Sequence, residues 1–217
     1  GLGDVYKRQV LCGCLISELA TGEVREQMLG KLVGGDLQLA LAASETGSRF
    51  NSSKVATTAK SNGNNIIING RKIAVLNGSN ANELLVVARE SGGEVDADGI
   101  SVFLVNPDTS GVTVRPFTNI DGQKSSEIDF ADVTVSASAR LGEQGNALMA
   151  IEKVIDKAII AVSAEAVGVL ETLLQKTVEY SKTRKQFGTV IGTFQALQHR
   201  MADMSVSYTH LTLPTKA

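Results

Sequence analysis

Hydrophobic and polar positions follow three different periods along the chain. Over residues 10–34, two apolar stretches separated by Gly22 repeat at helical spacing and predict two short helices. Over residues 35–139, short apolar or alternating runs separated by Asn- and Gly-rich turns predict β-strands. Over residues 140–204, apolar positions again recur every three or four residues. The sequence therefore predicts an α+β protein in which a β domain lies between two helical segments.

The middle segment contains a series of short expected strands with no helix between them. Such a series is typical of an antiparallel barrel or sandwich, and about a hundred residues are enough for one core. The expected strands lie at residues 37–42, 55–60, 65–76, 83–89, 99–105, 111–117 and 126–135. We therefore expect residues 35–139 to form one antiparallel β domain.

The third segment begins near Asn146 and continues without proline to about Tyr180. Its apolar stripe consists of Leu148, Ile151, Ile155, Ala158, Val162, Ala166, Val169 and Leu173. A helix of this length extends ~50 Å, at ~1.5 Å per residue, and is too long to be covered by one short partner. Gly168 either permits close contact with another helix or is simply tolerated. We expect further bundle helices that this sequence does not contain, and hence an incomplete chain.

The end of the long helix carries a group of polar and aromatic side chains. Arg184, Gln186 and Phe187 leave the helix together, just before Gly188, which can end a helix. A guanidinium fork suits a pyrophosphate, and an aromatic face suits stacking on a flat ring. The second helix that follows places Gln195 on the same face as His199, four positions later. Residues alone leave two interpretations open, namely a charged corner between packed helices or a binding corner.

The wording of this corner, TRKQFG followed by IGTFQALQHRMADM, closely resembles the acyl-CoA dehydrogenase family. The resemblance implies the end of an N-terminal helical domain (10–34), a middle β domain (35–139) and the first two helices of a C-terminal four-helix bundle (140–204). It also implies an FAD cofactor held partly by a neighbouring subunit. Carried over residue by residue, the expected FAD contacts at this corner are Arg184, Gln186, Phe187, Phe194 and Gln195.

A second set of expected FAD contacts lies in LALAASETGSRF, where a strand enters an acidic, Gly-containing loop. On residues alone, Ser44 only caps this loop. In the family, the matching strand offers main-chain groups and a hydroxyl to the flavin ring, so the resemblance implies Leu41, Ala43 and Ser44 as cofactor contacts. A serine that is usual near the end of the loop is Phe50 here, so that contact is missing.

Other positions depart from the family pattern. A Trp and a Thr that often cover and bond the flavin align with Ala74 and Leu76. This pattern looks closest to the branch that resembles the small subunit of pimeloyl-CoA dehydrogenase. In some members the catalytic carboxylate lies at the position of Ala158, beside an arginine that is Ile159 here. We therefore name no catalytic residue and expect the base in a later part of the bundle. Asp156 matches a family aspartate near acyl-CoA, which makes it a candidate substrate contact, although it could equally be a solvated helix carboxylate.

Composition excludes several classes of function. The chain has 217 residues, 43% hydrophobic residues, 21 Lys+Arg and 23 Asp+Glu, so its net charge of −2 provides no basic stripe for nucleic acid. No apolar run approaches the roughly 20 residues of a membrane span. Cys12 and Cys14 lack the spacing of zinc ligands and are expected to be buried free thiols, with no metal site. Free thiols are typical of a cytoplasmic location, which we also expect.

The resemblance implies an FAD-dependent acyl-CoA dehydrogenase that desaturates an acyl-CoA thioester. It further implies electron-transfer flavoprotein as electron acceptor, and a homodimer, homotetramer or heteromer. Two alternatives stay open: an acyl-CoA oxidase or flavin monooxygenase on the same fold, and a non-catalytic structural subunit of a heteromeric dehydrogenase. Residues 1–9 show no amphipathic period, and residues 205–217 become β-branched, polar and proline-bearing with no partner strand. We therefore expect them to be a non-native leader and tail.

Overall fold

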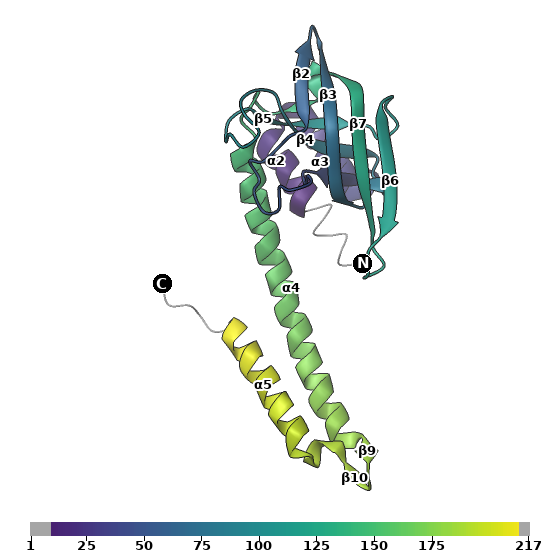
Figure 1. Ribbon diagram of the computed structural model, residues 1–217, viewed down its shortest axis with the longest axis vertical. Helices are drawn as coiled ribbons and strands as arrows, with labels where there is room; N and C mark the ends of the chain where they lie inside the picture. The colour runs from purple at the N-terminus through teal and green to yellow at the C-terminus, as the bar shows by residue number, and fades with distance from the viewer. Residues whose placement is uncertain (1–9, 213–217) are drawn as a thin grey trace. The chain divides into compact units, whose positions relative to one another are not determined.

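A computed structural model describes residues 10–212 (Figure 1). The expected leader, 1–9, and the end of the expected tail, 213–217, lie outside the described residues. The chain divides into two compact units, one up to Ala158 and one from Ile159 onward. Each unit is described by itself below.

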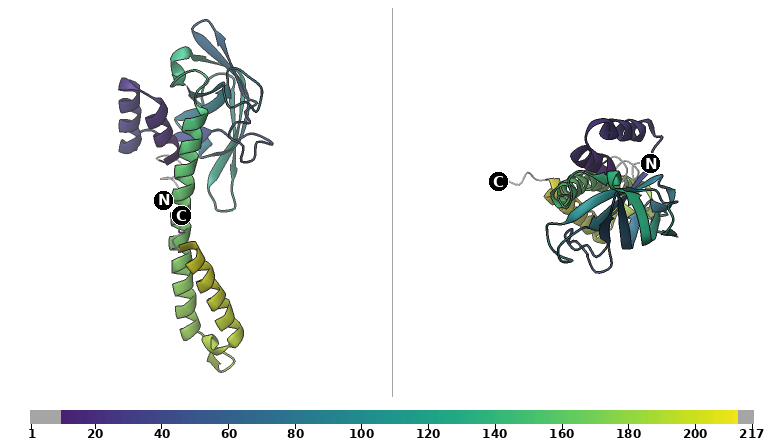
Figure 2. Two further views of the ribbon diagram at one scale, coloured as in Figure 1. Left: turned by 90° about the vertical axis from the view of Figure 1, so that its left-hand side faces the viewer. Right: turned by 90° about the horizontal axis from the view of Figure 1, so that it is seen from above.

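The first unit begins with the two expected short helices. A π-helical turn at 10–13 leads into α2 (Cys14–Leu19), and α3 (Gly22–Gly34) follows. The break, at Ala20 and Thr21, lies directly before the predicted glycine, Gly22, which begins α3 and has a left-handed backbone with φ of 57°. Gly35 ends α3 in the same region of backbone space, with φ of 87°, and its N–H bonds to the carbonyl of Leu32. Figure 2 shows both helices on one side of the sheet.

The sheet of the first unit has eight strands in the order β6-β7-β3-β2-β4-β5-β8, with β1 beside β4. The strands are β1 (Leu39–Ala42), β2 (Thr58–Asn62), β3 (Asn65–Leu76), β4 (Glu83–Arg89), β5 (Ile100–Val105), β6 (Val112–Thr118), β7 (Lys124–Ser136) and β8 (Arg140–Leu141). Short 3-10 helices, η2 (Gly78–Asn80) and η3 (Ala137–Ala139), lie between strands.

The expectation of a purely antiparallel domain was wrong, because β4 pairs in parallel with β1 and with β2. The β2–β3 hairpin lies between β1 and β4 in the chain and brings β4 back in the direction of both earlier strands. Alternating hydrophobicity predicts a strand but not the direction of its partner, so the sequence could not show this mixed pairing.

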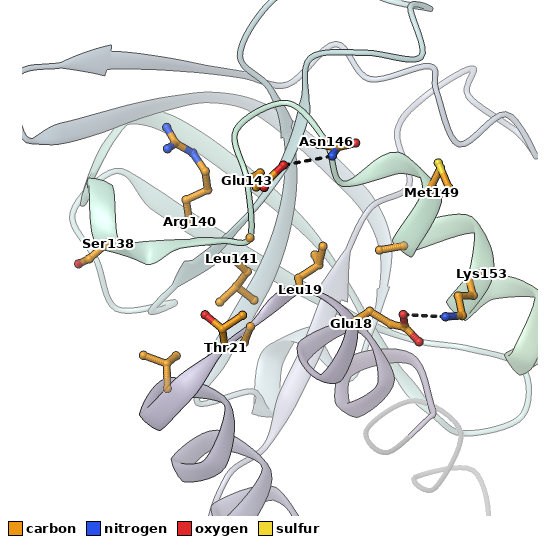
Figure 3. A pocket seen from close by; sticks show the side chains of 14 residues that line it. Glu18, Leu19, Thr21, Ser138, Arg140, Leu141, Glu143, Asn146, Met149 and Lys153 are labelled. Atoms are coloured by element: carbon orange, nitrogen blue, oxygen red, sulfur yellow. Dashed lines mark hydrogen bonds and ion pairs between the residues drawn. The ribbon is translucent and has the colours of Figure 1, made fainter.

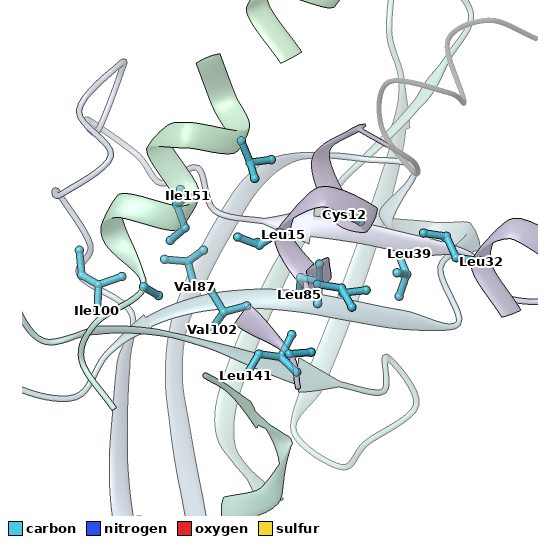
Figure 4. Close-up of a cluster of buried hydrophobic side chains, with 14 of the residues drawn as sticks. Cys12, Leu15, Leu32, Leu39, Leu85, Val87, Ile100, Val102, Leu141 and Ile151 are labelled. Carbon is cyan, nitrogen blue, oxygen red and sulfur yellow. The ribbon is translucent and has the colours of Figure 1, made fainter. Parts of the chain in front are cut away.

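Strands β1, β4 and β5 are buried on both faces. Leu39, Leu85 and Val102 face a core that α2, α3 and the start of α4 (Leu148–Thr183) complete (Figure 4). The neighbouring residues Ala40 and Val86 face a second core, formed with β3 and β7. Burial on both faces explains why β4 is a continuous apolar run instead of alternating with polar residues.

Strand β3 is bent by two irregularities in its pairing with β7. The second lies between Lys72 and Val75, which pair with Ile128 and Ser126, so that Ile73 and Ala74 together oppose one residue. Ala74 has a left-handed backbone with φ of 51°. This bulge turns the Ile73 N–H away from β7. The Ile73 N–H instead donates to the carbonyl of Ser44 at 2.9 Å.

The second unit is a helical hairpin. It contains α4 from Ile159 onward, a small hairpin of β9 (Lys185–Gln186) and β10 (Thr189–Val190), the 3-10 helix η4 (Ile191–Thr193) and α5 (Gln195–Thr212). Both predicted helices are confirmed. The predicted end of α5 at Met204 was wrong, because the helix continues to Thr212. No proline interrupts it there, and Thr209 satisfies its hydroxyl by donating to the carbonyl of Ser205. Whether residues 205–217 are native stays a prediction.

The apolar stripe of α4 is exposed within the second unit. Val162, Val169 and Leu173 are each about half exposed. By length and composition alone, α4 could also cross a membrane, which corrects the expectation that no segment approaches such a span. Core helices of soluble proteins can have the same length and composition.

Candidate functional site

The first group of predicted cofactor contacts lies where β1 enters the following loop. Leu41 and Ala43 are half-buried, and Ser44 is exposed. Two bonds from β3 hold this strand end: the Ile73 N–H donates to the Ser44 carbonyl, and the Lys72 ammonium donates to the Ala43 carbonyl at 3.2 Å. The strand end is therefore fixed by its main chain, while the Ser44 side chain stays open to a ligand.

Sequence reasoning missed an ion pair directly beside this strand end. Lys72 is fully buried, Glu45 is 7% exposed, and the Lys72 Nζ lies 2.5 Å from Oε1 of Glu45. The Glu45 carboxylate also accepts the N–H groups of Ala56 at 2.7 Å and Thr57 at 3.0 Å, which closes the loop between them. The sequence did contain a signal for this burial. Lys72 is an even number of positions from Ile66 and Ile68, so it lies on the same, buried face of β3.

Burial and pairing shift both members of this pair. Burial lowers the pKa of Lys72 to about 8, against the opposing effect of the Glu45 charge. For Glu45, burial alone would raise the pKa, but the charge and hydrogen bond of Lys72 and the bonds from Thr57 and Ala56 outweigh it, so that the pKa lies below its ordinary value.

A buried arginine holds the far end of the same loop. The Arg89 guanidinium donates to the carbonyls of Ser53 and Val55 on one side, and to that of Asp98 on the other, among other main-chain acceptors. Arg89 is 5% exposed and ends β4. The loop after Ser44 is thus anchored at both ends by charged side chains that bond to main-chain groups.

The second group of predicted contacts lies in the second unit, at the β9–β10 hairpin. Phe187 and Gly188 form its two-residue turn, both with left-handed backbones, at φ of 53° and 78°. This turn matches the right-handed twist of the paired strands, but it is an uncommon conformation for Phe. Phe187 is 92% exposed, and its ring meets that of Phe194 edge to face with centroids 6.3 Å apart.

The polar members of the second group, Arg184, Gln186 and Gln195, are close in sequence to the two rings. Arg184 directly follows the end of α4, and its carbonyl accepts the Ile191 N–H at 2.8 Å, which fixes the backbone of the corner. Gln186 lies in β9, Gln195 begins α5, and both side chains are exposed. Arg184 is also exposed, and no ion pair to it occurs within residues 10–212. An exposed guanidinium close in sequence to aromatic rings fits a phosphate joined to a flat ring system.

The predicted substrate contact, Asp156, is exposed on α4 in the first unit. Its neighbours Lys153 and Lys157 both bind Glu18 of α2, at 2.8 and 3.1 Å. Those two bonds lower the pKa of Glu18. The role of Asp156 stays a prediction.

A pocket of about 780 Å³ lies between the end of α2, β8 and the start of α4 (Figure 3). Glu18, Arg140, Glu143 and Lys153 are its charged lining residues. None of the predicted cofactor or substrate contacts lines this pocket.

The two cysteines lie near the start of the described residues. Cys12 is buried and Cys14 half-buried, both as free thiols, and burial raises the pKa of Cys12 to about 12. Among the described residues, no group of three or more His, Cys, Asp or Glu side chains is placed to hold a metal ion.

Comparison with known families assigns both units. The family model for the acyl-CoA dehydrogenase middle domain matches residues 40–133, and that for the acyl-CoA dehydrogenase C-terminal domain matches residues 148–215. The chain belongs to the acyl-CoA dehydrogenase family. The strand end at Ser44 therefore lies in its middle domain, and the Arg184–Phe187 corner lies in its C-terminal domain.

Individual members of the family agree with this assignment. A probable acyl-CoA dehydrogenase of Mycobacterium tuberculosis, FadE25, is 32% identical over 187 residues, which is 85% of this chain and 48% of that protein. The structure of butyryl-CoA dehydrogenase from Megasphaera elsdenii is 30% identical with a TM-score of 0.86, over 95% of this chain and 55% of that one. That of the prolyl acyl carrier protein oxidase AnaB is 27% identical with a TM-score of 0.87, over the same shares. The chain spans about half the length of these relatives.

The two family models match the regions that contain the predicted site. Every predicted cofactor contact lies within a matched range, from Leu41 to Gln195, but their individual roles stay predictions. The helices at 10–34 lie outside both ranges, and the narrower resemblance to a pimeloyl-CoA dehydrogenase small subunit also stays a prediction.

Proposed function

We propose that this chain is the middle portion of an FAD-dependent acyl-CoA dehydrogenase that forms an α,β double bond in an acyl-CoA thioester. The exposed Arg184–Phe187 corner, in a chain of this family, is the observation that carries the proposal. Bound FAD would supply the acceptor for the hydride that leaves the β-carbon.

The described residues divide the work of binding. Arg184 would hold the pyrophosphate as a bidentate donor, with Gln186 and Gln195 as further polar contacts. Phe187 and Phe194 would pack against flat parts of the cofactor. In the other unit, the Ser44 hydroxyl and the main chain from Leu41 to Ala43 would bond the flavin ring, and Asp156 would contact acyl-CoA. These roles rest on the exposure of each side chain and on the family resemblance.

The proton on the α-carbon must pass to a base, and the position on α4 where some relatives carry that base holds no carboxylate here. Ala158 and Ile159 occupy positions where some relatives carry a carboxylate and an arginine, and neither side chain can accept a proton. We propose that the base belongs to a longer form of this protein, in the later bundle. Electron-transfer flavoprotein as electron acceptor, an assembly of two or four subunits and a cytoplasmic location complete the proposal.

Two alternatives have their own support. An oxidase is favoured by the likeness to AnaB, which is named a prolyl acyl carrier protein oxidase. A structural subunit is favoured by the loss of the flavin-contacting side chains at Ala74 and Leu76 and of the arginine that relatives carry at the position of Ile159.

The test uses the complete parent protein and the 217-residue chain side by side. We expect the complete protein to purify with the absorbance of bound flavin, and an acyl-CoA panel to bleach it without oxygen. Flavin that binds but never bleaches would contradict a dehydrogenase and favour the structural subunit. Rapid reoxidation of the reduced flavin by oxygen would favour the oxidase. The 217-residue chain should bind FAD weakly or not at all and show no turnover.

A further inference from the structure

The buried pair of Glu45 and Lys72 surrounds one residue of the predicted flavin-binding strand. Lys72 donates to the Ala43 carbonyl on one side of Ser44 and to the Glu45 carboxylate on the other. The next residue of β3, Ile73, donates its N–H to the carbonyl of Ser44 itself. Three consecutive residues of the strand end are therefore fixed from β3, and the Ser44 side chain is the one left exposed.

Stability alone does not explain why this pair is buried. Removing two charges from water costs free energy that their attraction does not reliably return, and apolar residues of similar volume are often as stable. The surrounding core of β3 supplies such residues at the same parity, Ile66 and Ile68. A charged pair at this position has what an apolar pair lacks, namely directional bonds to the main chain of Ala43, Ala56 and Thr57.

The bonds of the pair also set the path of the loop that follows Ser44. Glu45 is bonded to residues eleven and twelve positions later, so its carboxylate determines how the chain leaves and re-enters the sheet. Without these bonds the strand end could shift slightly, and even a small shift changes the length and angle of a hydrogen bond. Small displacements of this kind are costly at a binding site that depends on geometry.

We propose that Glu45 and Lys72 form a positioning pair, which fixes Ser44 and the Ala43 main chain for contact with the flavin ring. The proposal rests on the function proposed above and adds to it two residues that do not themselves touch the cofactor.

The test measures FAD affinity and the visible circular dichroism of bound flavin in the complete protein. The variants are Glu45→Gln, Lys72→Met and the double substitution, in which no buried charge is left unpaired. Val105→Ala, a cavity variant in the second core, is the control, measured at a temperature where all proteins are folded. Melting temperatures show which variants have matched stability.

We expect the double variant to recover much of the stability lost in the single variants but to bind FAD roughly fivefold to tenfold more weakly than the parent, with an altered flavin signal. Val105→Ala should leave both flavin readouts unchanged. Parent-like FAD affinity and signal in the double variant would overturn the positioning role while leaving the proposed function intact. Failure of the parent protein itself to bind FAD would overturn the proposed function, and this inference with it.

Discussion

Lys72 provides the clearest case in which one side chain determines its surroundings. Replacing it with Met leaves the Glu45 carboxylate buried without its cation. We expect the first unit to lose about 3–5 kcal/mol of unfolding free energy, the usual cost of breaking a buried pair, in denaturant titrations. Lys60, exposed on β2, is the matched control, and Lys60→Met should change little. Equal effects of the two substitutions would contradict the importance of burial.

The lowered pKa of Glu45 makes the free energy of unfolding depend on pH. Its folded pKa lies below the ordinary value of 4.5, so its contribution is present above that pH and is lost as pH falls through the folded pKa. The stability difference between the parent and Glu45→Gln should therefore shrink as pH is lowered from about 6 to about 3. Unfolding titrations at several pH values measure it, and a difference that stays constant would refute the prediction.

Glu18 serves as the control for this pH series. Its pKa is also lowered, by Lys153 and Lys157, but the carboxylate is on the surface. Added salt screens surface pairs much more than buried ones. Glu18→Gln should therefore show a pH dependence that disappears in high salt, whereas that of Glu45→Gln should persist.

Phe187 combines an exposed ring with an unfavourable backbone. Asn tolerates the left-handed region, and Asn followed by Gly is the preferred sequence for such a turn. We expect Phe187→Asn to stabilise the β9–β10 hairpin by about 1 kcal/mol, because the strain of φ at 53° is relieved. In the complete protein the same change should weaken FAD binding, through loss of the ring. Calorimetry and FAD titration check the two parts, and unchanged FAD affinity would remove Phe187 from the site.

Strand β3 depends on a glycine at its first irregularity. Gly70 has φ of 150°, and an added Cβ would lie 2.5 Å from the Thr57 hydroxyl and 2.7 Å from its Cα. We expect Gly70→Ala to cost about 2–4 kcal/mol of unfolding free energy, from strain and crowding together. Gly63, in the β2–β3 turn, also has a left-handed backbone but open space around it. Gly63→Ala should therefore cost only about 1 kcal/mol, and equal losses would show that crowding is unimportant.

The elements that the sequence predicted well are those whose pattern is local. The predicted strand at 83–89 agrees with β4 residue for residue, because its apolar run is bounded by polar and glycine-containing turns. The long helix agrees within a few residues, since a stripe of this length without proline allows no other regular structure.

What the sequence did not predict depends on contacts between distant segments. The parallel pairing of β4 with β1 depends on where the β2–β3 hairpin sends the chain. The ion pair of Glu45 and Lys72 joins residues 27 positions apart, and a lysine in a strand is ordinarily taken to face solvent. Site residues at the Arg184–Phe187 corner came from the family resemblance, because their chemistry alone allowed a plain charged corner.

Within the described residues, an apolar stripe on α4 is only partly covered. Val162, Val169 and Leu173 are about half exposed on α4, and an exposed apolar surface of this kind promotes association. We expect the 217-residue chain to self-associate in a concentration-dependent way, measured by light scattering, and Leu173→Glu to reduce it. Glu171→Gln, two residues away on the same helix, is the control and should have no such effect. In the longer protein proposed above, Leu173→Glu should instead destabilise the fold, because the proposed later bundle helices would cover the stripe. A complete protein that tolerates Leu173→Glu without loss of stability would show that the stripe stays open there.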